Sequence, residues 1–562
     1  MNVEPPEGAR AAVRHSAVAA SGLLAACGGG HGDDSGTTRP ATSSRFTRPA
    51  DANQAARFLA QATMGAARSD IEALQATSYA AWIDAQVDVQ PLKGYYDFLA
   101  GPNGAFVLSG AGDHAAAGDV WRKMISSPDA LRQRMVHALA EIFVVYETDG
   151  PGPYIYMNFL DRLEQLAFGN FRDILQSVTL SLAMAKTLTY LGNLKEDPTT
   201  GCEPDENYAR EVMQLFTIGL YQLNADGSLV KDASGATIPT YDVPDVRGLA
   251  RVFTGWFNDN SALPAGAPSS DVAKRDLVQQ PQHHELGVKQ FLGTTIPAGT
   301  DGAASLKIAL DTLYNHPNVG PFIGRQLIQR LVTSNPSPVY IARVAAAFAD
   351  NGLGVRGDMK AVVKAVLLDD EARDPEIAAA PTFGKLREPM IRFVNWARGW
   401  KAASYSGWWG YDKTVHQFWS NDATSFNQCP LRSPSVFNFF RPSYVPPTTS
   451  IAAAGLVAPE FQITNEVSVA GFLNTMAPFI SSASYIDIRA DYSSLIALAV
   501  DSAALLAEVN LVLAAGQVGS DRLAGFKTAI DTIKSDTDTG KTNRVTAAIT
   551  LMLASPEYVV QK

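Results

Sequence analysis

Apolar residues recur at intervals of three and four along most of the chain after residue 51, and the apolar stretches end at Gly, Pro or Asn. This spacing places apolar side chains on one face of an α-helix. We therefore expect an all-α protein with about 15 to 18 helices and almost no strand. The clearest helices are predicted at Asp51–Ala62, Ser69–Gln86, Pro128–Tyr146, Ile155–Phe168, Phe171–Leu191, Asp205–Ile218, Asp242–Trp256, Pro317–Val332, Pro338–Ala349, Gly357–Leu368 and Lys385–Lys401.

The same pattern predicts how the helices are grouped. No repeat of fixed period occurs, so we expect one large irregular multi-helix domain over residues 51–480 and a C-terminal helical cap over 481–562 that belongs to the same body. A short β-hairpin is predicted at 223–241, where Asp226-Gly227 and Ser234-Gly235 supply turns beside β-prone residues. Asp242-Val243-Pro244-Asp245 has the N-cap acceptor, early proline and acidic first turn of a helix start.

The N-terminal segment has the features of a lipoprotein leader. Arg10 and Arg14 precede an apolar run over 16–26, which is too short to cross a bilayer and ends in Leu24-Ala25-Ala26-Cys27. We expect residues 1–26 to be a signal peptide, Cys27 to be lipidated and 27–50 to be a flexible tether. This predicts an exported protein anchored in the bacterial envelope, in the outer membrane. The alternative is a disordered, Ala-rich N-terminus.

Composition argues against a nucleic-acid-binding protein and against a membrane-spanning helix in the mature chain. The 562 residues carry a formal net charge of −10 and no Lys/Arg-rich run, so nothing offers a surface for nucleic acid. After the leader, no apolar stretch reaches the roughly 18 residues that a membrane-spanning helix needs. Apart from Cys27, only Cys202 and Cys429 are present, and they could form one disulfide or be two unrelated buried thiols.

Two familiar motifs are incomplete. Residues 352–357 match the spacing of a dinucleotide-binding loop, but they follow a helix rather than a strand, so their glycines serve better as a helix end and turn. His284-Glu285 begins like a zinc-protease motif, but Val288 stands where the second histidine belongs.

The first candidate site is the polar face of the predicted helix 205–218. At 100° per residue, its polar side chains gather on one side of the helix. Carboxylates there could act as acid and base, with the arginine orienting them. The competing interpretation is a solvated face with an ordinary i, i+4 ion pair between Glu206 and Arg210. The residues of this face are Glu206, Asn207, Arg210, Glu211 and Gln214.

The second candidate site is the segment from His283 to Lys289. It places the imidazole of His284, the carboxylate of Glu285 and the amine of Lys289 close together, which suits proton transfer or the binding of one or two metal ligands. A pair of surface histidines would look the same. Supporting contacts to a substrate are expected from Asp245, Arg251, Trp256, Trp408 and Trp409, whose alternative role is to fill the core.

Several segments together resemble the bacterial family catalogued as domain of unknown function 1800, over about residues 50–480. The resemblance implies an exported, predominantly helical protein, often encoded beside a second exported family, and it implies no activity. Many relatives carry His-Asn-His where this chain has Ala140-Glu141-Ile142, so a histidine-rich metal site would be incomplete here. The segments that carry the resemblance include 57–65, 131–145, 206–219, 245–256, 284–293 and 432–447.

These observations leave three functional hypotheses. The first is an envelope hydrolase or lyase that acts on a polymer such as a polysaccharide, with Glu206, Glu211 or His284 as acid and base and Arg210 and Lys289 neutralising charge. The second is a noncatalytic envelope scaffold that binds another exported protein. The third is a metal-dependent oxidoreductase with a divalent metal; the sequence assigns no cofactor.

Overall fold

The computed structural model describes residues 45–101, 115–146, 152–409 and 426–562. The described residues from 45 onward form one compact unit. The predicted signal peptide, Cys27 and most of the predicted tether lie outside the described residues, so both assignments stay predictions. The division at about 480 also stays a prediction. None of the described helices combines the length and apolar character that crossing a membrane requires.

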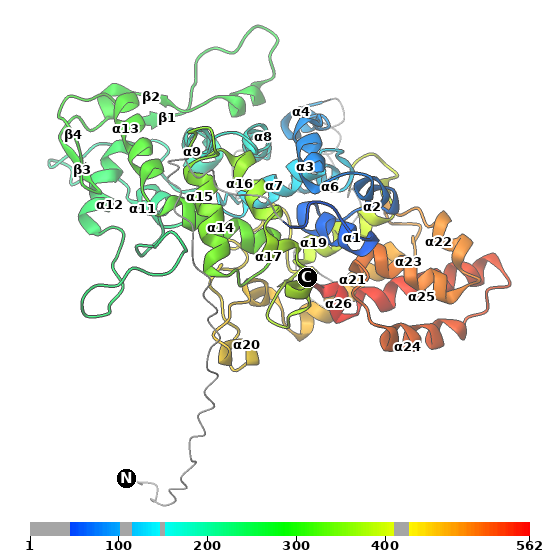
Figure 1. The fold of residues 1–562 in the computed structure, drawn as a ribbon. Coiled ribbons are helices and arrows are strands. Elements are labelled where there is room, and N and C mark those ends of the chain that lie inside the picture. The colour runs from blue at the N-terminus through cyan, green and yellow to red at the C-terminus, as the bar shows by residue number, and fades with distance from the viewer. Residues whose placement is uncertain (1–44, 102–114, 147–151, 410–425) are drawn as a thin grey trace, which may run out of the picture. The chain divides into compact units, whose positions relative to one another are not determined.

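The all-α prediction is confirmed: helices dominate, and the strands are short pairs (Figure 1). The helices are more numerous and shorter than predicted, because polar or turn residues interrupt several apolar runs. The run 69–86, for example, is divided at residues 76–78, and 171–191 is divided near Leu180. The first helices are α1 (Ala52–Ala62), α2 (Arg68–Gln75), α3 (Tyr79–Asp88), α4 (Tyr95–Leu99), α6 (Ala115–Ser126), α7 (Ala130–Ala140), α8 (Tyr154–Leu166), α9 (Phe171–Thr179) and α10 (Leu182–Thr187).

The middle of the chain contains most of the irregular structure. The predicted hairpin near 223–241 is present as isolated bridges, Leu223 with Leu229 and Lys231 with Thr237, rather than as a continuous ladder. The predicted start of helix α12 is confirmed, since Asp242 and Asp245 cap each other's backbone N–H groups. The elements are α11 (Asn207–Gln214), α12 (Val243–Ala250), η2 (Arg251–Phe253), β1 (Trp256–Phe257), η3 (Ser269–Lys274), β2 (Val278–Gln279), η4 (Pro281–His283), β3 (Lys289–Phe291), β4 (Thr294–Ile296) and α13 (Gly302–Asn315).

The last part of the chain returns to helices. The helix predicted at 385–401 begins only at Pro389, because Lys385–Leu386 is a strand that pairs antiparallel with the C-terminal residues. The elements are α14 (Val319–Leu331), α15 (Pro338–Ala349), α16 (Met359–Leu367), α17 (Asp370–Arg373), α18 (Pro375–Ala379), β5 (Lys385–Leu386), α19 (Pro389–Gly399), β6 (Ala403–Ser404), α20 (Ser450–Ala453), η6 (Pro459–Ile463), α21 (Glu466–Ile480), β7 (Ile488–Arg489), α22 (Ser493–Leu498), α23 (Ser502–Ala514), α24 (Ser520–Asp531), α25 (Asp538–Leu553), α26 (Pro556–Val559) and β8 (Val560–Gln561).

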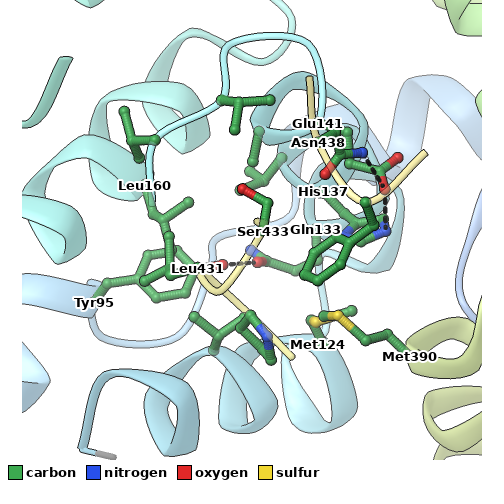
Figure 2. Close-up of a pocket in the computed structure, with 17 residues that line it drawn as sticks. Tyr95, Met124, Gln133, His137, Glu141, Leu160, Met390, Leu431, Ser433 and Asn438 are labelled. Carbon is green, nitrogen blue, oxygen red and sulfur yellow. Dashed lines mark hydrogen bonds and ion pairs between the residues drawn. The ribbon is translucent and has the colours of Figure 1, made fainter. Parts of the chain in front are cut away.

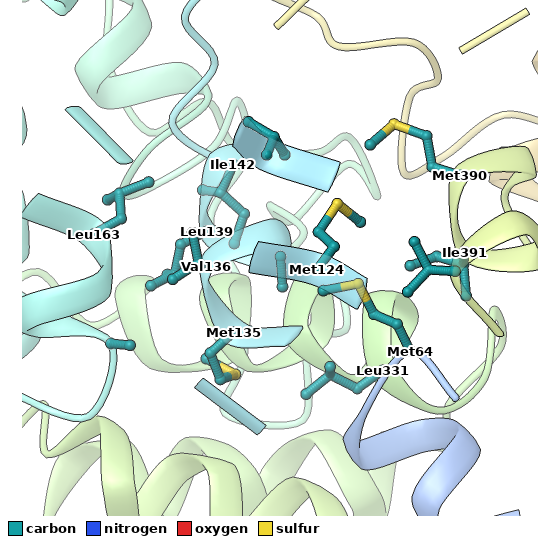
Figure 3. Packing of buried hydrophobic residues seen from close by; sticks show 14 of the residues in the cluster. Met64, Met124, Met135, Val136, Leu139, Ile142, Leu163, Leu331, Met390 and Ile391 are labelled. Carbon is teal, nitrogen blue, oxygen red and sulfur yellow. The ribbon is translucent and has the colours of Figure 1, made fainter. Parts of the chain in front are cut away.

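Helix α7 lies at the centre of this arrangement and contacts α1, α3, α6, α8 and α14. Its apolar residues pack against side chains from distant parts of the chain, among them Met64, Leu331 and Met390 (Figure 3). Because α7 is surrounded on most sides, its polar residues Gln133 and Arg134 are buried, and His137 is largely enclosed. Buried polar groups need hydrogen-bond partners, so the polar side chains of α7 must find theirs on neighbouring elements of the fold.

Candidate functional site

A cavity of about 70 Å³ lies beside α7 (Figure 2). Helices α4, α6 and α8, residues 144–145, the start of α19 and the segment 430–439 complete its walls. Most of the lining is apolar, and the polar exceptions stand out against it. The apolar lining includes Val120, Met124, Val136, Leu160 and Met390, and the polar lining includes Gln133, His137, Glu141, Ser433 and Asn438.

Helix α7 places two of these polar side chains together. His137 and Glu141 are four residues apart, so they project from the same face of the helix, and Glu141 occupies its C-cap. His137 Nε2 lies 3.8 Å from Glu141 Oε1. The side-chain amide of Asn438 donates to the same oxygen at 3.2 Å, as the dashed lines of Figure 2 show.

A second carboxylate, Glu388, stands behind His137. Glu388 precedes Pro389 at the start of α19, and its Oε2 lies 3.1 Å from His137 Nε2. The side-chain amide of Gln428 donates to this oxygen at 2.8 Å. Strand β5 keeps the position rigid, because Lys385 and Leu386 pair with the C-terminal Gln561 and Val560.

Buried cations surround the two carboxylates. Arg330 on α14 has its Nε 3.5 Å from Glu141 Oε2, and its Nη2 donates to the backbone oxygen of Glu141 at 3.0 Å. Lys385 Nζ lies 3.9 Å from Glu388 Oε1 and 2.9 Å from Glu460 Oε1. Arg134, which donates to the backbone oxygen of Arg330, adds a third cation. The three buried carboxylates Glu141, Glu388 and Glu460 are thus opposed by three buried cations.

The two carboxyl groups beside His137 differ strongly in acidity. Burial raises the pKa of Glu141 to about 7, and the negative charge of Glu388 adds to this effect. Burial also acts to raise the pKa of Glu388, but His137 and Lys385 outweigh it and hold that pKa well below its usual range. At neutral pH, Glu388 is therefore ionised while Glu141 exchanges its proton readily.

Two polar atoms of the cavity wall have no hydrogen-bond partner within the described part of the chain. They are Glu141 Oε2 and the hydroxyl oxygen of Ser433. A buried polar atom without a partner costs about 1–3 kcal/mol, so folds rarely retain one without a use for it. These atoms lie where a bound molecule could supply their partners.

The model of the DUF1800 family, whose description is a protein of unknown function, matches residues 57–560. The chain belongs to the DUF1800 family. The family resemblance predicted from the sequence is confirmed, and the match extends beyond residue 480 to include the C-terminal helices. Comparison with curated proteins and with solved structures gave no match.

In this DUF1800 protein, His137, Glu141 and Glu388 could also hold a metal ion as far as distance is concerned. One ligand atom from each residue lies within 4.8 Å of the others. The carboxylates, however, are already opposed by Arg330, Lys385 and Arg134, which reduces the attraction for a divalent cation. The balance of charge therefore favours proton transfer over metal binding at this site.

The polar face of α11 lies outside the cavity of this DUF1800 protein. Glu206 pairs with Arg210 at 2.9 Å and with Arg247 at 3.3 Å, and all three side chains are partly exposed. Asn207 donates to Thr189 at 3.3 Å, and Gln214 accepts from the hydroxyl of Tyr241 at 2.9 Å. Glu211 is buried, and burial raises its pKa. A catalytic role for these residues stays a prediction.

The segment predicted as the second site is partly buried. His284 and Lys289 are almost completely enclosed, whereas Glu285 is half-buried and accepts from the backbone N–H of Gly287 at 2.7 Å. Helix α12 packs against both α11 and β3, but among the described residues no hydrogen bond or ion pair joins the carboxylates of α11 to His284 or Lys289.

The residues predicted to support a substrate have structural contacts. Asp245 accepts from the backbone N–H of Leu292 at 2.6 Å, and Arg251 pairs with Glu196 at 2.6 Å. Trp256 and Trp409 are buried, and Trp408 is half-buried. Cys202 and Cys429 are not joined by a disulfide.

Sequence reasoning missed His137, Glu141, Glu388 and Ser433 as site residues. A signal for the first two was present, because they interrupt the apolar run Val136–Val145 at helical spacing. Such a pair inside a buried helix must have partners elsewhere in the fold. Glu388 has no comparable signal, since it follows two positively charged residues in a polar segment.

Proposed function

We propose that this protein is a hydrolase of the bacterial envelope that cleaves a small acyl ester, with Glu141 as the proton carrier and the α7 cavity as the acyl pocket. The observation that carries the proposal is a pair of polar atoms without a hydrogen-bond partner among the described residues, Glu141 Oε2 and Ser433 Oγ, on the wall of a mostly apolar cavity; Arg330 Nε lies 3.5 Å from the first of them. A cavity of about 70 Å³ accommodates a group such as acetyl. The ester would therefore be a substituent on a larger molecule, such as an envelope polysaccharide.

The reaction needs one group that both accepts and returns a proton. Glu141 in its ionised form takes a proton from the attacking water at Oε2, while the water oxygen bonds to the ester carbonyl carbon. The hydroxyl of Ser433 donates to the carbonyl oxygen as negative charge develops on it. Glu141 then gives the proton to the leaving oxygen as the carbon–oxygen bond breaks, which yields a carboxylic acid and an alcohol.

His137 lines the cavity beside Glu141, and Glu388 supports the step from behind His137. Glu388 does not border the cavity, so we assign it a positioning role: its charge supports the near-neutral pKa of Glu141, and it holds His137. A proton carrier is most effective when its pKa is near the working pH. The pKa values of Glu141 and Glu388 are pushed in opposite directions, which is the pattern expected of an acid–base site.

The same geometry argues against glycoside hydrolysis. Glycosidases place two carboxyl groups about 5–9.5 Å apart, on either side of the sugar bond. Here oxygens of Glu141 and Glu388 lie within 4.8 Å of one another, and His137 occupies the space beside both. A polysaccharide backbone has no room between them.

The test is ester hydrolysis by the mature protein with methylumbelliferyl acetate, butyrate and decanoate. We expect turnover of acetate to exceed that of decanoate and Glu141→Gln to lower kcat by about 10²–10⁴-fold. Wild-type kcat/KM should rise with pH through about 7 as Glu141 ionises. Glu388→Gln should move this rise to lower pH, because it removes a negative charge that disfavours ionisation of Glu141.

The exposed Glu203→Gln variant is the matched control, and circular dichroism checks that each variant folds. Loss of activity on chelation, with recovery on adding Zn²⁺ or Mn²⁺, would replace acid–base catalysis with metal catalysis at these residues. No hydrolysis of any ester by folded protein would favour the noncatalytic scaffold.

A further inference from the structure

The α7 cavity has a reacting end and a far end. Helix α7 and its C-cap supply Gln133, Val136, His137, Ala140 and Glu141 to the wall, and their spacing places them on one side of the helix. Glu141, the proposed proton carrier, is the last of these residues and Gln133 is the first. Because an α-helix rises about 1.5 Å per residue, the two positions lie about 12 Å apart along the axis.

Gln133 closes the far end together with Tyr95 of α4. The Tyr95 hydroxyl donates to Gln133 Oε1 at 2.7 Å, as a dashed line in Figure 2 shows. Gln133 Nε2 donates to Asp129 Oδ2 at 2.9 Å and also to Glu164. Both polar atoms of this amide are engaged by the protein, so the amide closes the cavity rather than holding a polar substituent of a bound group.

Between the two ends, the wall of the cavity is hydrocarbon. Val120 and Met124 of α6, Leu160 of α8 and Met390 of α19 line the same cavity as Val136 of α7. Burial of an apolar chain against such side chains is favourable, whereas a hydroxyl or charged substituent would lose its water partners without replacement. The chain that fits this part of the cavity is therefore an unsubstituted hydrocarbon.

The volume of the cavity limits the length of that chain. An apolar cavity of about 150 Å³ takes up benzene, which has six carbon atoms. By the same ratio, the α7 cavity of about 70 Å³ holds roughly three heavy atoms. An acetyl group has three heavy atoms, namely the methyl carbon, the carbonyl carbon and the carbonyl oxygen. A butyryl group has two more, so it exceeds the space available.

Two apolar side chains of α7 bound this space on successive turns. Ala140 and Val136 are four residues apart, so they lie one above the other on the helix, and both line the cavity. Ala140 is adjacent to Glu141 in sequence, and its small side chain leaves room for a methyl group beside the reacting end. Val136 lies about 6 Å further along the axis, where a longer chain would have to extend.

We propose that Ala140 and Val136 restrict the acyl group to acetyl, so that the substrates are O-acetyl esters. This proposal rests on the ester hydrolysis proposed for the α7 cavity. Neither side chain can move a proton, so both residues determine specificity through their size alone. Alanine and valine differ by two methyl groups, so Ala140→Val fills the cavity and Val136→Ala enlarges it by the same number of atoms.

The first test compares hydrolysis of methylumbelliferyl acetate, propionate and butyrate. In wild type we expect kcat/KM for acetate to exceed that for butyrate by at least about tenfold, which is the cost of about two methylene groups left without space. Val136→Ala should raise kcat/KM for butyrate about fourfold for each carbon that it admits, with little change for acetate. Ala140→Val should lower kcat/KM for acetate at least about tenfold without loss of thermal stability, because it fills a cavity. The exposed Ala470→Val on α21 is the matched control.

The second test measures the size of the pocket without any catalysis. Binding of acetamide, propionamide and butyramide is followed by saturation-transfer NMR, and circular dichroism checks that Val136→Ala is folded. Val136→Ala should favour butyramide, and Ala140→Val should abolish binding of all three amides.

The two tests separate this proposal from the proposed hydrolysis. Amide binding in this order without ester hydrolysis would disprove the hydrolysis and leave the acyl pocket standing. Ester hydrolysis with a chain-length preference that neither substitution changes would overturn the role of Ala140 and Val136 and leave the hydrolysis standing. Folded protein that neither hydrolyses the esters nor binds the amides would overturn both.

Discussion

Glu141 and Glu388 have the same side chain, yet their surroundings assign them different chemistry. Burial and the charge of Glu388 outweigh the contacts of Glu141 with His137 and Arg330, whereas His137 and Lys385 outweigh burial at Glu388. Because the two share His137, a change in one is felt by the other. A substitution at either glutamate therefore tests directly how these buried charges compensate one another.

Removal of Glu388 should destabilise the protein. In Glu388→Ala, His137, Lys385 and Gln428 lose their shared partner while they remain buried, which typically costs about 3–5 kcal/mol. Urea unfolding followed by circular dichroism measures the change, with the exposed Glu203→Ala expected within about 0.5 kcal/mol of wild type. Equal stability of the two variants would show that the network around Glu388 is not maintained in solution.

At the scale of elements, close backbone approach decides where helices can meet strands. Helix α12 touches β3 at Gly248, where the backbone oxygen of Gln290 leaves no space for a side chain. Gly525 in α24, by contrast, is exposed and has no atom within 4 Å of where its Cβ would lie. Two glycines in helices thus have opposite physical roles.

The Gly248→Ala and Gly525→Ala variants should change stability in opposite directions. Gly248→Ala forces α12 away from β3 and should cost about 2–4 kcal/mol. Gly525→Ala should stabilise by about 0.5–1 kcal/mol, because alanine loses less conformational freedom in a helix. Thermal unfolding compares them, and destabilisation of similar size in both would contradict the α12–β3 contact.

At the scale of the whole molecule, buried carboxyl groups link stability to pH. Burial raises the pKa of Glu141 to about 7 and that of Asp119 to about 7, both above the values of the unfolded chain. The folded state therefore binds more protons near neutrality, so its stability decreases as pH rises through these values. His284 and His316, whose pKa values burial lowers, act in the opposite direction, mainly below about pH 6.5.

The free energy of unfolding should fall by about 1.5 kcal/mol between pH 6.5 and pH 8, which follows from two carboxyl groups titrating near 7. Glu141→Gln should lose about half of this dependence, because glutamine does not ionise. Urea unfolding across this pH range measures both slopes. An identical slope in wild type and variant would mean that Glu141 does not titrate there.

The proposed location in the envelope depends on Cys27, which lies outside the described residues. We expect Cys27→Ser to keep residues 1–26 attached, to block labelling by radioactive palmitate and to release the protein from the membrane fraction. Cys202→Ser is the matched control for loss of a thiol. Equal palmitate labelling in wild type and Cys27→Ser would show that the anchor is elsewhere or absent.

The sequence by itself determined the helical class, the family and many helix starts. These depend on local physics: apolar spacing of three and four, and N-cap side chains such as Asp51, Asp242 and Ser337 that bond to backbone N–H groups a few positions later. Interruptions of the helices were harder to predict, because packing decides whether a helix continues through residues such as those at 76–78.

Only the tertiary structure decided which polar residues meet. His137 and Glu388 are separated by 251 positions and become neighbours because α7 and the start of α19 pack in one core. Lys385 joins them through a strand paired with the last residues of the chain, which no local pattern indicates. Burial and opposing charges then set the acidity of each carboxyl group, and both arise from contacts between residues that are distant in sequence.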